Sequence, residues 1–174
     1  VEHRDSAGFH AIVKPGELNL MTAGSGISHS ERSTAKTTIL HGAQLWVALP
    51  KNARAIDKTF EHYAPPTISV ANGLITAQVF LGSLLGSTSK VETHTQLLGA
   101  EVNMSPGSNL VLDHAVGLNP EFEHGVLVDT GEVVVESGKQ KQLVVKDELA
   151  FIESGSTSII ITAGPDPVRI LIIG

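Results

Sequence analysis

The 174-residue sequence contains no cysteine. A disulfide, a thiolate-ligated metal and a cysteine nucleophile are therefore all excluded, and the composition suits a reducing, cytoplasmic location. Aromatic residues are also scarce, at 4% of the chain. No apolar stretch is long enough to cross a bilayer and no signal-peptide pattern opens the chain, so we expect no membrane partner.

Basic residues are too few and too scattered for a nucleic-acid surface. Lysine and arginine together number 12 against 18 aspartate and glutamate residues, which gives a formal net charge of −6. An acidic chain without a clustered basic face is a poor ligand for a phosphate backbone. Direct nucleic-acid binding is therefore disfavoured, whereas binding to a DNA-binding protein is compatible with this charge. The length suffices for one good core or two small ones.

Convincing helical periodicity is nearly absent, and strand signals dominate. Short aliphatic and β-branched segments alternate with Gly, Pro, Asn, Asp or Ser. Turn residues at 129–131 and 137–138 favour hairpins. Many short strands with regular turns predict an all-β sandwich or barrel. We expect strands at residues 9–13, 17–21, 43–49, 74–81, 90–93, 99–104, 108–112, 125–129, 132–137, 141–145, 148–152, 157–162 and 168–173.

One segment, residues 53–63, has the spacing of a helix. Ile56, Phe60 and Tyr63 follow one another at i, i+4 and i+7. An extended linker with scattered apolar anchors explains the same residues equally well. Because Pro65-Pro66 ends the segment, we expect a module boundary near residues 50–66.

A faint internal repeat suggests two related β-modules. The sequence VKPGELNLMTAG, from Val13, resembles VKDELAFIESG, from Val145, after a one-residue deletion. The first copy continues into SGISHSE, which offers metal ligands, and the second continues into STSIIIT, which offers none. Only the first module is therefore equipped for metal chemistry.

The candidate ligands of the first module are His29 and Glu31. If GISHSE is extended, alternation puts Ile27, His29 and Glu31 on one face of the strand. An imidazole nitrogen and a carboxylate oxygen suit iron, nickel, manganese, copper or zinc. Two ligands alone make a weak metal site, and a polar patch on a strand is the competing interpretation. His3 and His10 are near enough in sequence to join His29 on adjoining strands.

The single tryptophan and the remaining histidines are best explained by packing or local bonding rather than by ligand binding. Trp46 in QLWVALP is typical of core or inter-module packing rather than of ligand stacking. Solvated or locally bonded rings are the simplest interpretation of the other histidines, which are His41, His62, His94, His114 and His124.

Three blocks in order, VEHRDSAG, VKPGELNLMTAGSGISHSE and AQLWVALP, resemble successive blocks of the pirin family, and weaker similarity continues to the last strand. Pirins are bicupins, with two β-barrels of the cupin type in one chain. The resemblance implies an all-β double β-barrel, or jelly-roll, fold with an incomplete N-terminal barrel. Residues 1–62 would be the C-terminal part of the N-terminal module with its linker, and residues 63–174 a second cupin-like module.

The resemblance also implies a mononuclear metal centre. Family members hold one metal, usually iron, through three histidines and a glutamate, and His29 and Glu31 match one histidine and the glutamate. The other two histidines belong to an upstream His-x-His block, which does not occur in this sequence. We therefore expect half of a metal site, in a chain that looks cut from a longer protein.

Two functions are associated with pirins. Some members are quercetin 2,3-dioxygenases, which open a flavonol ring with molecular oxygen, and others bind transcription factors or metabolic enzymes. For the enzyme, the resemblance implies Glu31 as ligand and base and His29 as ligand. Leu20 and Ser25 stand where the family often has tryptophan and arginine, which leaves substrate preference open. A dioxygenase, a protein-binding regulator and a fragment without activity are the three expectations.

Overall fold

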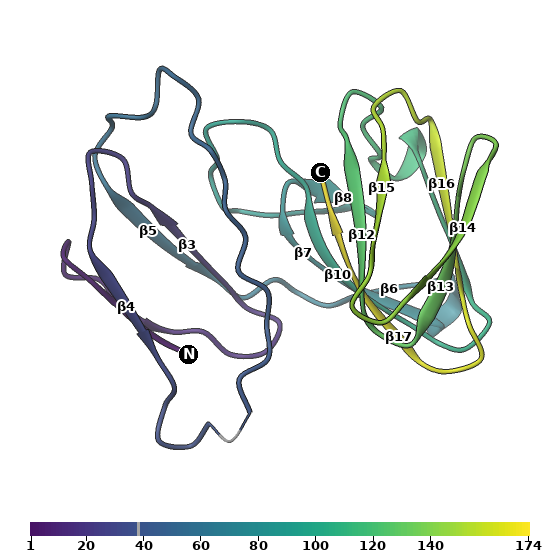
Figure 1. Cartoon of the computed structure of the whole chain (residues 1–174), viewed down its shortest axis with the longest axis horizontal. Coiled ribbons are helices and arrows are strands. Elements are labelled where there is room, and N and C mark those ends of the chain that lie inside the picture. The colour runs from purple at the N-terminus through teal and green to yellow at the C-terminus, as the bar shows by residue number, and fades with distance from the viewer. Residues whose placement is uncertain (38) are drawn as a thin grey trace. The chain divides into compact units, whose positions relative to one another are not determined.

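The computed structural model describes residues 1–37 and 39–174, and nearly all of the regular secondary structure in these residues is β-strand (Figure 1). The predicted all-β class is confirmed. The chain divides into two compact units: unit 1 comprises residues 1–65 and 91–96, and unit 2 comprises residues 66–90 and 97–174. The expected module limits, 1–62 and 63–174, stay a prediction. None of the helices among the described residues has the length and hydropathy that a membrane span needs.

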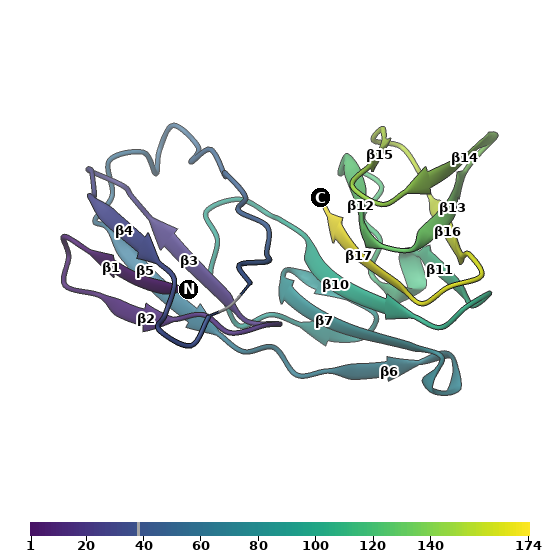
Figure 2. The ribbon, with the colours of Figure 1, turned by 60° about the horizontal axis from the view of Figure 1, so that its bottom comes forward.

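Unit 1 contains two small antiparallel sheets, visible in Figure 2. In the first, β1 (Glu2–Asp5) lies between β2 (His10–Ile12) and β4 (His29–Arg32). In the second, β3 (Leu18–Thr22) pairs with β5 (Thr59–Tyr63). Polar and charged residues fill much of β1 and β4, so the first sheet brings reactive side chains together rather than building an apolar core.

Unit 2 contains a six-stranded sheet in the order β15-β12-β17-β10-β7-β6 and a four-stranded sheet in the order β11-β16-β13-β14. A short β8–β9 pair and two 3₁₀ helices, Ala71–Gly73 and His114–Val116, complete its regular structure among the described residues. The strands are β6 Ile68–Val70, β7 Ile75–Leu81, β8 Ser83–Leu84, β9 Ser87–Thr88, β10 Gly99–Met104, β11 Asn109–Asp113, β12 His124–Thr130, β13 Glu132–Ser137, β14 Gln140–Val145, β15 Leu149–Ile152, β16 Ser158–Ala163 and β17 Val168–Ile173.

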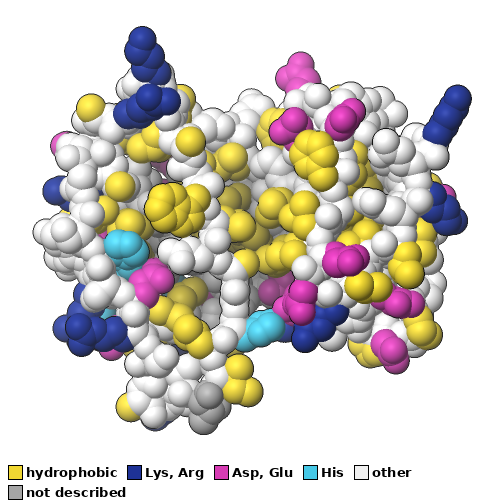
Figure 3. Space-filling model, in the orientation of Figure 1, with side chains coloured by type: hydrophobic (Ala, Val, Ile, Leu, Met, Phe, Trp, Pro, Cys, Tyr) yellow, Lys and Arg dark blue, Asp and Glu magenta, His cyan; other side chains and the backbone are white. Residues whose placement is uncertain are grey.

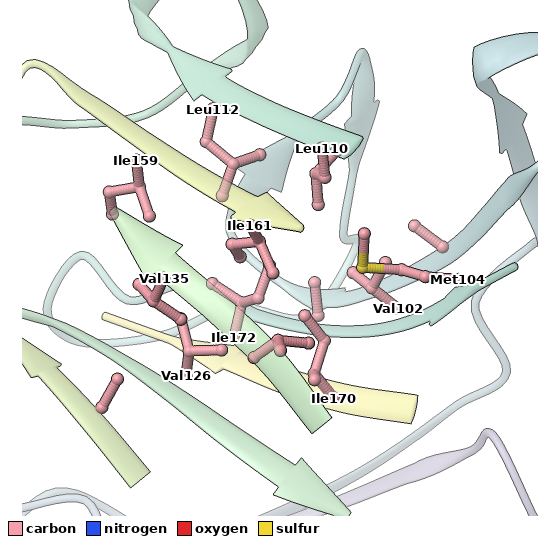
Figure 4. Close-up of a cluster of buried hydrophobic side chains, with 14 of the residues drawn as sticks. Val102, Met104, Leu110, Leu112, Val126, Val135, Ile159, Ile161, Ile170 and Ile172 are labelled. Carbon is pink, nitrogen blue, oxygen red and sulfur yellow. The ribbon is translucent and has the colours of Figure 1, made fainter. Parts of the chain in front are cut away.

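Alternating aliphatic residues build the core of unit 2. In β7 every second residue is buried, from Ile75 to Leu81. Strands β16 and β17 contribute Ile161, Ile170 and Ile172, which are fully buried and point toward one another in Figure 4. Each such side chain stabilises the fold by about 1.5–3 kcal/mol relative to an exposed position. The period of two in the sequence therefore decides which face of each strand is buried.

The two predicted hairpins have different outcomes. Strands β13 and β14 pair antiparallel around the turn at 137–138, as expected. The hairpin at 129–131 is wrong, because β12 belongs to the six-stranded sheet and β13 to the four-stranded sheet. Gly131, with φ of 78°, takes the chain from one sheet to the other, and a Cβ there would lie 2.8 Å from the Pro167 carbonyl oxygen. The turn residues thus mark a corner between sheets.

Several other expectations are wrong. Residues 43–49 and 90–93 form no strand, because an alternating sequence needs a paired neighbour to complete its hydrogen bonds. Of the two interpretations of residues 53–63, the helix is wrong: turns occupy 51–55, and Thr59–Tyr63 is the extended strand β5. Trp46 is 93% exposed, so its interpretation as a core residue is also wrong.

His124, at the start of β12, is 1% exposed rather than solvated. Both of its ring nitrogens are buried and have no hydrogen-bond partner in the described part of the chain. Burial, which disfavours the charged imidazolium, is the main reason why the pKa of His124 lies below its ordinary value, and the nearby Phe122 backbone opposes this only in part. Unit 2 therefore holds His124 as a neutral ring.

Acid should destabilise unit 2 through His124. Above about pH 6.5, the ordinary histidine pKa, the folded and unfolded chains both carry a neutral His124. As the pH falls below that value the unfolded chain is protonated first, so the free energy of unfolding decreases until the lower folded pKa is reached. Urea unfolding at about pH 8 and pH 5.5 measures this loss. His124→Leu should reduce the loss, whereas His114→Gln, at an exposed position, should leave it unchanged. An undiminished loss in His124→Leu would contradict the assignment.

Candidate metal centre

The antiparallel register of β1 and β4 gathers the candidate ligands. His3 lies opposite Glu31, and Asp5 lies opposite His29. Directly opposed residues of an antiparallel pair project from the same face, so these four side chains share one face of the sheet. The expected extended conformation around His29 and Glu31 is confirmed, because His29–Arg32 is β4.

Three of these side chains form a group that could bind a metal ion. His3, His29 and Glu31 each place one ligand atom within 4.8 Å of the others. His3 Nδ1 lies 3.6 Å from Glu31 Oε1, and the rings of His3 and His29 have centroids 5.6 Å apart. Two imidazoles and a carboxylate are suitable ligands for a divalent transition metal. The residues present therefore fit such an ion.

His10 lies outside this group. It hydrogen-bonds Glu2 at 2.7 Å, and Glu2 alternates with His3 along β1, so this pair belongs to the opposite face. Of the two histidines near His29 in sequence, only His3 joins it. His62, in turn, hydrogen-bonds Asn19 Oδ1 at 2.7 Å, which confirms its interpretation as a locally bonded ring.

An aromatic stack flanks the buried end of the group. The Phe60 ring, from β5, stacks on His3 with centroids 4.5 Å apart and planes at 22°. Phe9 stacks on Phe60 at 5.7 Å and is 40% exposed. The second sheet of unit 1 thus faces the ligand-bearing side of the first. Sequence reasoning counted Phe60 in a candidate helix, and nothing in its local sequence indicated this contact.

The Asp5 carboxylate contacts Nε2 of the His3 ring. Its side chain is fully buried, its Oδ2 lies 3.2 Å from His3 Nε2, and its Oδ1 accepts hydrogen bonds from the backbone amides of Ala7 and Phe9 at 2.9 and 3.1 Å. Burial, the largest single influence, would raise the pKa of Asp5. Hydrogen bonds, from the Phe9 amide and the His3 ring above all, outweigh it, so the pKa lies below its ordinary value. Sequence reasoning missed Asp5, although its i, i+2 spacing from His3 placed both on one strand face.

The known proteins that the chain matches agree with the resemblance seen in the sequence. The family model for pirin matches residues 1–47. A Pseudomonas aeruginosa protein provisionally named as a quercetin 2,3-dioxygenase is 35% identical over 172 residues, which cover 99% of this chain and 51% of that protein. Human pirin is 27% identical over 156 residues, which cover 89% of this chain and 52% of pirin. The chain therefore spans about half the length of the curated relatives it matches.

A solved structure agrees over nearly the whole chain. The crystal structure of quercetin 2,3-dioxygenase from Acinetobacter baumannii superposes with a TM-score of 0.86 at 34% identity, covering 99% of this chain and 54% of that one. The β-barrel fold and this likeness define a protein of the cupin class, and the predicted bicupin with an incomplete first barrel is confirmed. Within that class, the family model and the named relatives that the chain matches are those of the pirin family.

Metal content provides a direct test of the group. After incubation with Fe²⁺ or Zn²⁺ and desalting, we expect near-stoichiometric metal by plasma mass spectrometry. His29→Ala should lower the bound metal about tenfold or more, because loss of a ligand should cost at least as much as loss of a residue that supports one. His10→Ala is the matched control, since His10 lies on the opposite face of the same sheet. Equal metal in His29→Ala and the unchanged chain would exclude His29 as a ligand.

Proposed function

We propose that this chain provides part of a metal-dependent dioxygenase of the quercetin 2,3-dioxygenase type, with His29 and Glu31 as metal ligands and Glu31 also as the base. The observation that carries the proposal is the convergence of His29 and Glu31 with the buried His3. The names of similar proteins support the reaction class. By family resemblance the metal is iron, and the cysteine-free composition suits a cytoplasmic enzyme.

The exposed and the buried residues of the group would have different roles in the proposed reaction. A bound divalent ion would supply Lewis acidity that favours the deprotonated 3-hydroxyl of a flavonol. Glu31 is 43% exposed, so its carboxylate is accessible to a small molecule and can accept that proton. His29 is also exposed, whereas His3 is buried and fixes the opposite side of the group.

The stacked rings of His3, Phe60 and Phe9 favour binding of a planar aromatic substrate. Phe9 and Phe60 continue from the His3 ring toward the surface, with Phe9 partly exposed. Flat aromatic molecules pack favourably in offset contact with such rings. A flavonol-like small molecule could pack against the Phe9 and Phe60 rings beside the metal ligands.

A protein-binding regulator is the second candidate function, with a transcription factor or a metabolic enzyme as the partner. Unit 1 exposes large apolar side chains between β4 and β5, including Ile39 (78%), Leu40 (64%) and Trp46 (93%). Exposed apolar surface, tryptophan above all, is typical of protein interfaces. Hydrophobic side chains are also visible on the face drawn in Figure 3. A protein-binding function would use the exposed apolar side chains between β4 and β5 rather than the metal ligands.

Oxygen uptake with a flavonol distinguishes these functions. The metal-loaded chain should consume oxygen with quercetin, and Glu31→Gln should lower the rate about 10²-fold or more, because the amide cannot accept the hydroxyl proton. Glu2→Gln, on the opposite face of the sheet, should retain the rate. The absence of turnover by metal-loaded protein, together with specific partner binding that Trp46→Ala abolishes, would favour the regulator. The absence of both would favour a fragment without activity.

A further inference from the structure

We propose that Asp5 is a positioning residue that holds the proton of His3 on Nε2, so that Nδ1 faces His29 and Glu31 as a third ligand atom. This inference rests on the metal centre of the proposed function. The inference concerns the two nitrogens of the His3 ring: Nε2 lies 3.2 Å from Asp5 Oδ2, and Nδ1 lies 3.6 Å from Glu31 Oε1.

The Asp5 carboxylate is held firmly enough to impose a tautomer on its neighbour. Its side chain is fully buried, and its Oδ1 accepts two backbone hydrogen bonds, from Ala7 and Phe9. The second oxygen, Oδ2, is left to accept a proton from His3 Nε2. An ionised carboxylate can only accept hydrogen bonds, so Nε2 must be the nitrogen that carries the hydrogen.

The other nitrogen of His3 consequently carries a lone pair. A neutral imidazole has one N–H, so donation from Nε2 leaves Nδ1 as an acceptor. Nδ1 lies 3.6 Å from Glu31 Oε1, another acceptor, which is too far for an ordinary hydrogen bond. Two lone pairs that face each other at this distance favour a cation beside them.

Burial and one ring contact prevent the His3 ring from turning away. His3 is 1% exposed, and Phe60 stacks on it at 4.5 Å. A carboxylate behind a ligating imidazole is a recurrent arrangement, because it fixes the ring orientation and increases the basicity of the ligating nitrogen. The Asp5–His3 pair has this arrangement.

The opposite face of the same sheet carries a second carboxylate–histidine pair, which serves as a control for Asp5 and His3. On the opposite face, Glu2 lies 2.7 Å from His10 Nε2, and Arg4 donates to the same carboxylate at 2.6 Å. These two side chains, Arg4 first, lower the pKa of Glu2. His10 is half exposed and belongs to no ligand group among the described residues. Glu2→Gln therefore removes a carboxylate–histidine contact without affecting the proposed centre.

Two-bond ¹H–¹⁵N correlation spectra of the metal-free chain at about pH 8 measure the tautomer directly, with His3→Gln assigning the His3 signals. We expect the Nε2–H form in the unchanged chain and in Glu2→Gln. In Asp5→Asn the amide oxygen can keep the Ala7 and Phe9 contacts, while the NH₂ group faces Nε2, so the proton should move to Nδ1. An Nδ1–H form in the unchanged chain would overturn the proposal, even if Asp5→Asn fails to fold. An unaltered tautomer in folded Asp5→Asn would also overturn it.

Metal affinity tests the consequence for the ligand. Titration with Co²⁺, followed by its visible absorption, should show about 10- to 100-fold weaker binding in Asp5→Asn than in the unchanged chain or Glu2→Gln. Equal affinity in Asp5→Asn, with the proton moved to Nδ1, would show that His3 is not a ligand. Neither measurement uses flavonol turnover, so failure of the proposed dioxygenase activity would be distinguishable from failure of this inference.

Discussion

The register between β1 and β4 is the constraint on which the candidate centre depends. With His3 opposite Glu31 and Asp5 opposite His29, all four side chains share one face. A slip of one residue would send one strand's ligands to the other side of the sheet. The contacts beyond the strand ends oppose such a slip: the Ser6 amide donates to the Ser28 carbonyl at 2.8 Å, and the Ser28 amide donates to the Ser6 hydroxyl at 3.1 Å.

Unit 2 shows what a similar pair of strands does with different side chains. The internal repeat relates the strands that follow Val13 and Val145, so β13 and β16 correspond in order to β1 and β4. In unit 2, Val133 lies opposite Ala163 and Val135 opposite Ile161, and all four are buried. Aliphatic residues at these inward positions form a core. Histidine and carboxylate residues in β1 and β4 form a ligand group, so side-chain type separates the two roles.

Much of unit 2 could be predicted from the sequence, because period-two alternation of aliphatic residues identifies a strand and its buried face together. Strand β1 escaped prediction since its sequence, EHRD, contains no apolar residue. The reverse error occurred at residues 43–49, where alternation is present but no ladder forms. For the site, spacing within one strand related His29 to Glu31. The proximity of His3, the role of Asp5 and the stacking of Phe60 depend on contacts between strands, which local sequence does not encode.

The unequal burial of the three candidate ligands has a physical consequence. His3 is 1% exposed and is fixed by Asp5 and Phe60, whereas the Glu31 side chain is 43% exposed. A fixed ligand holds an ion in place with little loss of side-chain entropy, while an accessible carboxylate can exchange protons with a small molecule. Catalytic metal sites keep one coordination position open to water or substrate, whereas structural sites are closed. The exposure of His29 and Glu31 beside a rigid His3 leaves one side of the group accessible, which is what the proposed function requires.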